Sequence, residues 1–281
     1  MSGKINPDSA LAAGFWETGR LDDCPIYDFH GHMHEMSGGY LPAGQPAQML
    51  ETIERAGIRS FVFCSHLALY CAERGEQANL EPIRAYGNPP GRPMLHAYLG
   101  VQSYNLDFER DRRLLEQNAD VYVGCKFLQD YFHVPLEHPM HTPYWEYLNA
   151  HGLLALCHTW GGSPYDGPRN VRAVAEKYTN VTLICGHSMH GAWDEAIRVA
   201  RDCPNVYLEL TAVLDNDRGV LDRFVREVGS DRILFGTDLP WFSTHHAVGC
   251  ILDAEMTDDD RHNILHRNGE RLLARFPWFS K

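Results

Sequence analysis

The sequence predicts an α/β protein whose eight parallel strands close into a (β/α)8 barrel, the TIM barrel, within a single domain. Eight short apolar runs recur along the chain, and each is followed by a segment of helical spacing or composition. The runs are mostly continuous rather than alternating, as parallel strands buried on both faces require. The length of 281 residues also suits this class, since such barrels run to about 250 residues as one domain.

An open, doubly wound sheet is the alternative fold. It usually has fewer strands and carries a Gly-rich phosphate loop after its first strand. Here the first apolar run ends in His30-Gly31-His32 instead, and no internal linker divides the chain. We therefore predict one barrel domain over residues 25–281, preceded by a polar leader over residues 1–24.

The predicted strands are the apolar runs themselves. In chain order they cover residues 25–32, 58–64, 94–101, 122–128, 153–158, 181–187, 206–211 and 232–238. The helices that follow them cover residues 45–57, 73–87, 107–118, 142–152, 168–178, 193–203, 219–229 and, in several pieces, 245–276.

Local signals support the bounds of these helices. Gly57 ends the first, and the breaker Asn88-Pro89-Pro90-Gly91 follows the second. Thr142 is expected to cap the fourth helix, Gly152 to end it, and Pro168 to start the fifth. The remaining helices are predicted from apolar stripes at helical spacing, such as Ala196, Ile197 and Ala200. Asn268 is expected to cap the last helix.

Composition narrows the class of partner. The chain is 44% hydrophobic and 22% charged, as in ordinary globular proteins, and its formal net charge is -12. Nucleic acids and anionic membranes reward Lys and Arg patches, so neither is expected as a partner. We expect a small-molecule substrate and a homo-oligomer.

The cysteines predict a reducing compartment. The eight cysteines show no C-x-x-C spacing, and Cys64, Cys125, Cys157 and Cys185 lie in or end apolar runs, as buried small hydrophobes do. No apolar stretch has the length of a signal-peptide core or a membrane span. The expected location is the cytoplasm.

Polar residues stand at the C-terminal ends of five predicted strands. They are His30, His32, Lys126, His158, His187 and Asp238. In a barrel these ends converge on one mouth, where the sites of this fold lie. Residues two apart on a strand point the same way, so His30 and His32 would present two imidazoles together, as a metal site requires.

At these motifs the chain resembles the amidohydrolase superfamily, in detail its amidohydrolase-2 branch of metal-dependent hydrolases and decarboxylases. The resemblance spans nearly the whole barrel. It rests on residues 28–32 (DFHGH), 124–126 (GCK), 157–159 (CHT), 184–188 (ICGHS), 235–240 (FGTDLP) and 264–273 (ILHRNGERLL).

The resemblance implies a role for each strand-end residue. His30, His32 and Asp238 would bind a divalent metal, with His158 completing the shell of a one-metal site. His187 would polarise the metal-activated water or the substrate, and Asp238 would accept the proton of that water. Zinc is the expected ion, with Mn²⁺ or Fe²⁺ as alternatives, because mixed nitrogen and oxygen ligands do not select sharply.

Lys126 leaves two alternatives open. In two-metal members a strand-four lysine carries a carboxyl group that bridges the ions, and the histidines of strands five and six, here His158 and His187, hold the second ion. Otherwise Lys126 is an unmodified cation that binds a substrate carboxylate.

Loop residues after the strands could line the same mouth. The candidates are His34, His66, Trp160, Arg169, His190, Glu209, Trp241, His245 and His246, of which about a third are expected to touch substrate. We predict that Lys126, Trp160, Arg169, His66 and Trp241 bind substrate, and that Arg169 forks onto a carboxylate.

The predicted function is hydrolysis of a small carbonyl compound (a lactone, ester or amide) by a metal-activated water. The alternative is metal-dependent decarboxylation of an aromatic or unsaturated acid, which needs a cationic clamp on the substrate carboxylate. Hydrolysis is preferred because the full set of strand-end residues matches the two-metal pattern.

Overall fold

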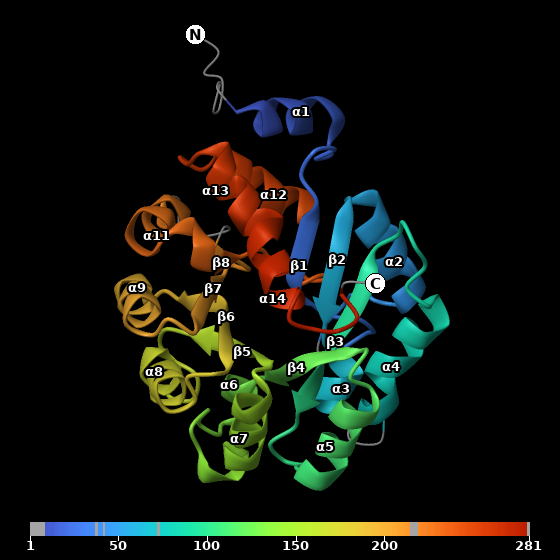
Figure 1. Cartoon of the computed structure of the whole chain (residues 1–281), viewed down its shortest axis with the longest axis vertical. Coiled ribbons are helices and arrows are strands. Elements are labelled where there is room, and N and C mark those ends of the chain that lie inside the picture. Colours follow the sequence, from blue (N-terminus) through green and yellow to red (C-terminus); the bar gives the residue numbers. More distant parts are fainter. Residues whose placement is uncertain (1–8, 37–38, 42, 72–73, 214–218, 280–281) are drawn as a thin grey trace.

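The apolar runs form eight parallel strands that neighbour one another in chain order (Figure 1). This computed structural model describes residues 9–36, 39–41, 43–71, 74–213 and 219–279. The strands are β1 (Ile26–Gly31), β2 (Ile58–Phe63), β3 (Met94–Val101), β4 (Tyr122–Phe127), β5 (Leu154–Trp160), β6 (Thr182–His190), β7 (Val206–Glu209) and β8 (Ile233–Leu234).

Backbone hydrogen bonds between β1 and the segment after β8 close the sheet into a barrel. Phe29 N donates to Phe235 O at 3.0 Å, and His32 N donates to Leu239 O at 2.6 Å. Asp238 N donates to His30 O at 2.6 Å, which places two predicted site residues in direct backbone contact. The single-domain (β/α)8 prediction is confirmed.

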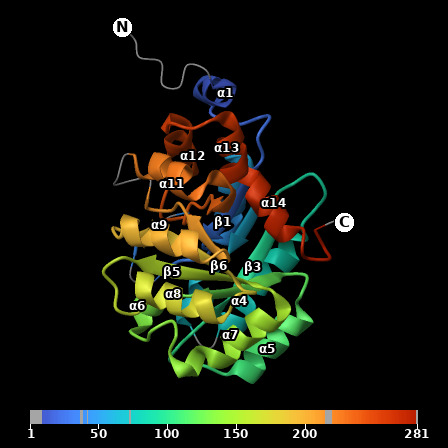
Figure 2. The same cartoon turned by 60° about the vertical axis from the view of Figure 1, so that its left-hand side comes forward.

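Helices surround the strands on the outside, as Figures 1 and 2 show. They are α1 (Ala10–Thr18), α2 (Pro46–Arg55), α3 (His66–Tyr70), α4 (Gly75–Tyr86), α5 (Phe108–Gln117), α6 (Gln129–Phe132), α7 (Thr142–His151), α8 (Pro168–Lys177), α9 (Trp193–Asp202), α11 (Val220–Val228), α12 (Thr244–Asp253), α13 (Asp258–His262) and α14 (Asn268–Leu273). A π-helical turn, Asn263–Arg267, joins α13 to α14.

The strands are buried as their continuous apolar sequences predict. Every residue of β1 and β4 is buried, and Cys64, Cys125, Cys157 and Cys185 are at most 1% exposed. All the cysteines are free thiols. In the part of the chain described here, no helix has the length and apolarity that crossing a bilayer requires.

Several local predictions need correction. β8 is only two residues long, because the chain leaves the β conformation before Asp238, whose φ is 56°. His141 occupies the cap position of α7, and Thr142 is the first helical residue. Asn268 does not cap α14; its amide is buried and donates to Ser230 O at 2.7 Å and Ile233 O at 2.8 Å.

The predicted leader contains the unexpected helix α1, capped by Ser9, whose side chain accepts from Ala12 N. Residues 1–8 of the leader lie outside the described residues. Ser9 Oγ also donates to Asp258 Oδ1 at 2.6 Å, so the leader is tied to α13 at the other end of the chain.

Candidate active site

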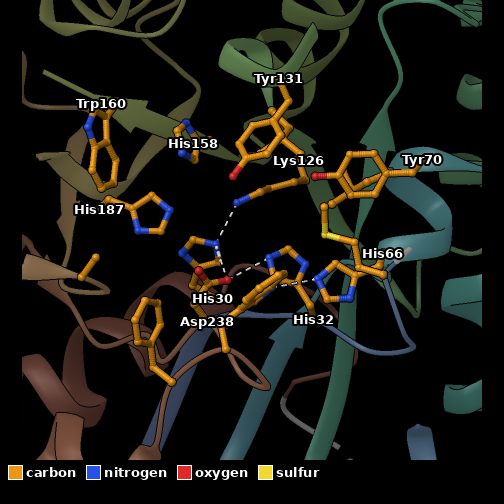
Figure 3. Close-up of a pocket in the computed structure, with 16 residues that line it drawn as sticks. His30, His32, His66, Tyr70, Lys126, Tyr131, His158, Trp160, His187 and Asp238 are labelled. Atoms are coloured by element: carbon orange, nitrogen blue, oxygen red, sulfur yellow. Dashed lines mark hydrogen bonds and ion pairs between the residues drawn. The ribbon is translucent and has the colours of Figure 1, made fainter. Parts of the chain in front are cut away.

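The C-terminal ends of the strands open into a pocket of about 230 Å³. It brings together all six strand-end residues that the sequence predicts, as Figure 3 shows for His30, His32, Lys126, His158, His187 and Asp238. The other lining residues are Met36, His66, Leu69, Tyr70, Leu128, Tyr131, Trp160, Ala212, Trp241 and Phe242.

Glu209, at the end of β7, fixes the ring of His30. His30 Nδ1 donates to Glu209 Oε2 at 2.7 Å, and the same carboxylate accepts from Thr211 N, Thr211 Oγ1 and His187 N. A Cβ atom at residue 236 would lie 2.2 Å from Glu209 Oε1, so only glycine leaves room for this carboxylate. With Nδ1 protonated, His30 turns the lone pair of Nε2 toward the pocket.

The other histidines are oriented in the same way. His32 Nδ1 lies 2.7 Å from Cys64 O, and His158 Nδ1 lies 2.8 Å from Asp166 Oδ2. His187 Nδ1 faces Thr211 O at 3.3 Å. Acceptors at Nδ1 favour the tautomer with a free Nε2 lone pair, the arrangement typical of metal-binding histidines.

Asp238 supplies a carboxylate beside these lone pairs. Its Oδ1 lies 2.9 Å from His32 Nε2 and 3.5 Å from His30 Nε2. This oxygen is buried and has no aligned hydrogen-bond donor, because both rings donate from Nδ1 elsewhere. Burial raises the pKa of Asp238, whereas positive charge on the imidazoles of His30 and His32 lowers it, and the net effect holds that pKa well below its usual range.

His30, His32 and Asp238 fit a divalent metal ion. Their ligand atoms lie within 4.8 Å of one another, and all three side chains are buried. Burial and the Lys126 ammonium hold the pKa of His30 well below its usual value, so the ring is neutral, as a ligand must be. His30, His187 and Glu209 form a second group of this spacing, but the Glu209 oxygens already accept four hydrogen bonds.

Unusual backbone conformations at His187 and Asp238 direct these two side chains into the pocket. His187, Ser188 and Met189 have φ values of 66°, 49° and 55°, and that of Asp238 is 56°. Residues other than glycine rarely adopt this left-handed region, and such strain clusters at functional sites. Ser188 Oγ donates to Glu209 O at 2.7 Å, and Met189 N donates to Thr159 Oγ1 at 2.8 Å. These hydrogen bonds offset part of the cost of the left-handed conformation.

Lys126 reaches the same group from β4. Its Nζ lies 2.8 Å from His30 Nε2, and the residue is 1% exposed. Burial lowers the pKa of Lys126, although the carboxylates of Asp238 and Glu209 act against this. The fraction of neutral, nucleophilic amine is therefore larger than for a solvated lysine.

Aromatic side chains form the wall of the pocket. Figure 3 shows the hydroxyl groups of Tyr70 and Tyr131 pointing toward Lys126. Burial raises the pKa of both tyrosines, so they remain protonated hydrogen-bond donors. Trp160 stacks beside His158 with ring centroids 5.9 Å apart, and Trp241 Nε1 donates to His66 Nε2 at 3.0 Å.

Three of the nine loop candidates, His66, Trp160 and Trp241, line the pocket. Arg169 does not: it is exposed on α8 and is absent from the pocket wall. Glu209 orients His30 from behind the site. The others also lie outside the wall: His34 bonds Ser65, His190 stacks on Trp160, His245 packs near Phe15, and His246 contacts Cys250.

Sequence reasoning missed the residues that the short helices after strands contribute. Tyr70 lies on α3 and Tyr131 on α6, helices of five and four residues that carry no readable periodicity. Asp166, which orients His158, lies in a loop eight residues further along the chain. The short separation of Asp166 from His158 in the sequence was the only indication of this contact, and it is weak evidence.

A model of the amidohydrolase family matches residues 100–275 of the chain. Among curated proteins, no significant match is found.

Solved structures show the same fold. An uncharacterised TIM-barrel protein from Bordetella bronchiseptica is 20% identical, with a TM-score of 0.70 over 89% of this chain and 99% of that one. A dihydroxybenzoic acid decarboxylase from Polaromonas sp. JS666, with bound manganese and the inhibitor 2-nitroresorcinol, is 15% identical (TM-score 0.66, 89% and 97%). A probable 2-pyrone-4,6-dicarboxylic acid hydrolase from Acinetobacter baumannii with citric acid bound is 12% identical (TM-score 0.64, 89% and 99%).

Proposed function

Because the chain belongs to the amidohydrolase family, in its amidohydrolase-2 branch, we propose that it is a metal-dependent hydrolase of a small carbonyl compound such as a lactone, ester or amide. Similar structures include both hydrolases and decarboxylases, so the reaction is argued from the pocket itself.

His30, His32 and Asp238 are the proposed ligands of a first ion, for which zinc, manganese or iron would suit the mixed nitrogen and oxygen donors. A bound divalent ion would supply Lewis acidity and lower the pKa of water to about 7. The bound manganese of the Polaromonas relative supports a metal at this mouth.

The chain's own side chains would carry the protons. Asp238 Oδ1, ionised and without an aligned donor, accepts the proton of the attacking water and returns it to the leaving group. Burial and the neighbouring imidazoles of His158 and His30 hold the pKa of His187 well below its usual value. A neutral ring with its proton on Nδ1 only accepts at Nε2, so His187 orients the water rather than polarising the carbonyl.

The position of His158 is the observation that favours hydrolysis. It belongs to neither of the two groups of metal-ligand spacing that include His30. Its ring instead lies beside that of His187, with centroids 4.9 Å apart. The ring of His187 lies 5.1 Å from that of His30, which lies 5.6 Å from that of His32, so the four imidazoles form a continuous row. Lys126 Nζ lies 2.8 Å from His30 Nε2, in the middle of this row (Figure 3). A carboxylated Lys126 would complete a two-metal centre, and its lowered pKa favours the neutral amine that reacts with CO₂.

Decarboxylation of an aromatic acid is the second candidate, and the pocket wall favours it. Tyr70, Tyr131, Trp160, Trp241 and Phe242 suit a flat ring, and an unmodified Lys126 would hold its carboxylate. Arg169 is too exposed to act as the clamp. The aromatic wall suits a small unsaturated ring compound in either reaction.

Metal content tests the proposed ligands. Elemental analysis of the purified chain is expected to find at least one divalent ion, and His30→Ala and His32→Ala should each contain fewer ions per chain than the wild type. His245→Ala, an exposed histidine outside the pocket, is the matched control and should retain the ion. Activity that persists unchanged after removal of all metal by a chelator contradicts the proposal.

Product analysis separates the two reactions. A panel of lactones, including 2-pyrone-4,6-dicarboxylate, and of hydroxybenzoates is followed by acid release and by CO₂ release. We expect acid release, two more ions per chain in the wild type than in His30→Ala, and a ¹³C carbamate signal from labelled bicarbonate that Lys126→Gln abolishes. CO₂ release, a difference of one ion and no carbamate would instead assign decarboxylation.

A further inference from the structure

Three metal-ligating side chains meet outside the pocket, where the start of the barrel contacts the end of the chain. They are Cys24, two residues before β1, His262 at the end of α13, and His266 in the π-helical turn. Their ligand-type atoms lie within 4.8 Å of one another. Figure 1 shows α13 and α14, in red, beside the blue strand β1.

The two histidines are held for joint coordination. His262 and His266 are four residues apart, so both rings project from the same face of the helical segment. His262 Nδ1 lies 3.0 Å from His266 Nε2, and His266 Nδ1 donates to Glu270 Oε1 at 3.0 Å. With its proton directed to Glu270, His266 accepts from His262 Nδ1 through the lone pair of Nε2, and a metal ion at this position would replace that hydrogen bond.

Protonation also suits a metal site. Burial, His266 and Arg267 lower the pKa of His262, so this ring is neutral at pH 7. Cys24 is fully buried, its Sγ has only a 3.9 Å contact with Pro25 O, and burial raises the pKa of its thiol to about 12. Such a thiol is unreactive as an acid or nucleophile, and a cation must displace its proton to bind the sulfur.

We propose that Cys24, His262 and His266 form a second, independent zinc site that fastens the segment before β1 to the C-terminal helices. One sulfur and two nitrogen ligands suit Zn²⁺, and typical bond lengths place tetrahedral ligand atoms about 3.3 to 3.6 Å apart. The two histidine nitrogens, 3.0 Å apart, would therefore separate slightly, and Cys24 Sγ already lies within 4.8 Å of the histidine ligand atoms. Both histidines are partly exposed, which leaves the fourth position to water.

Binding of Zn²⁺ to this site releases one proton in total. The Cys24 thiol releases one proton to solvent as it binds as thiolate. The proton on His262 Nδ1 is lost while Nε2 gains one, so this ring changes tautomer without changing charge. His266 keeps its Nδ1 proton on Glu270.

Cobalt spectroscopy tests this site apart from the pocket. No cysteine lines the pocket wall, so a thiolate-to-cobalt charge-transfer band can arise only elsewhere. Titration of the chelator-treated full chain with Co²⁺ should give this band, with the intensity at saturation of a single thiolate ligand per chain, and Zn²⁺ should remove it. The band should persist in His30→Ala and in the control Cys71→Ser, and be lost in Cys24→Ser and His266→Ala.

Glu270→Gln keeps the assay informative if Cys24→Ser fails to fold, because the Glu270 side chain is 39% exposed. It is expected to weaken Co²⁺ binding about 10- to 100-fold. A wild-type chain without the band, a band that survives Cys24→Ser, or unchanged affinity in Glu270→Gln would overturn the proposal. Loss of metal from the pocket alone would leave this band in place.

Discussion

Glu209 Oε2 lies 2.7 Å from His30 Nδ1, and neither side chain is more than 1% exposed. We predict that Glu209→Gln weakens metal binding at the pocket about 10- to 100-fold, because the negative charge that raises the basicity of His30 is lost. Competition with a chromophoric chelator measures the affinity. Glu176→Gln, which alters an exposed ion pair with Arg172, is the control. Equal affinities for the two variants would contradict this role.

Asp238→Asn tests the proposed base. The expected loss of turnover is about 10²- to 10⁴-fold, as for removal of a general base. The pKa of Asp238 is held well below its usual range. The wild-type rate should therefore fall only in acid below that range, and the variant should lack this limb. A pH-rate profile of kcat checks both points, and an unchanged acid limb in the variant would assign it to another group.

His96 should make stability depend on pH. Burial lowers its pKa from 6.5 to about 4. Between these values the unfolded chain binds a proton that the folded chain excludes, so stability falls as pH decreases. The loss approaches about 3 kcal/mol at pH 4.

Urea unfolding at pH 7 and at pH 4.5 measures this effect. His96→Asn should lose less stability between the two pH values than the wild type, whereas the exposed control His245→Asn should behave like the wild type. Identical pH slopes for His96→Asn and the wild type would exclude His96 as the cause.

Asn268→Ala should destabilise the barrel at the base of β8. It leaves the carbonyl groups of Ser230 and Ile233 without their buried donor, at an expected cost of about 2 to 4 kcal/mol. Asn263→Ala removes one partly buried bond to Ser230 Oγ and should cost less than about 1.5 kcal/mol. Urea unfolding at pH 7 compares them, and equal losses would refute the argument.

The sequence predicted best those features that depend on the residue types within a single strand. Continuous apolar runs predicted the strands, and the polar residue at the end of each run predicted His30, Lys126, His158 and His187 at the mouth. Strand periodicity and parallel topology are enough for this, since they determine which way a strand-end side chain points.

Features that depend on contacts distant in sequence were not predictable in this way. Glu209 was one of the candidates for the mouth, but its contact with His30, 179 positions earlier, could not be predicted. Asp238 adopts a left-handed conformation that its sequence neighbourhood does not reveal, and this shortened β8. Tyr70 and Tyr131 reach the pocket from helices too short for a periodic signal.

The hydrogen bond from Asp238 N to His30 O can form only late in the synthesis of the chain. Thr237 and Asp28, which hydrogen-bond beside it, are 209 residues apart, so this seam joins nearly the two ends of the barrel. A nascent chain that ends before Asp238 contains His30 and His32 but cannot place them beside Asp238. Joining segments so distant in sequence has an entropic cost that is repaid late, when the last strand docks. His30, His32 and Asp238 can therefore come together only after the ribosome has synthesised all eight strands.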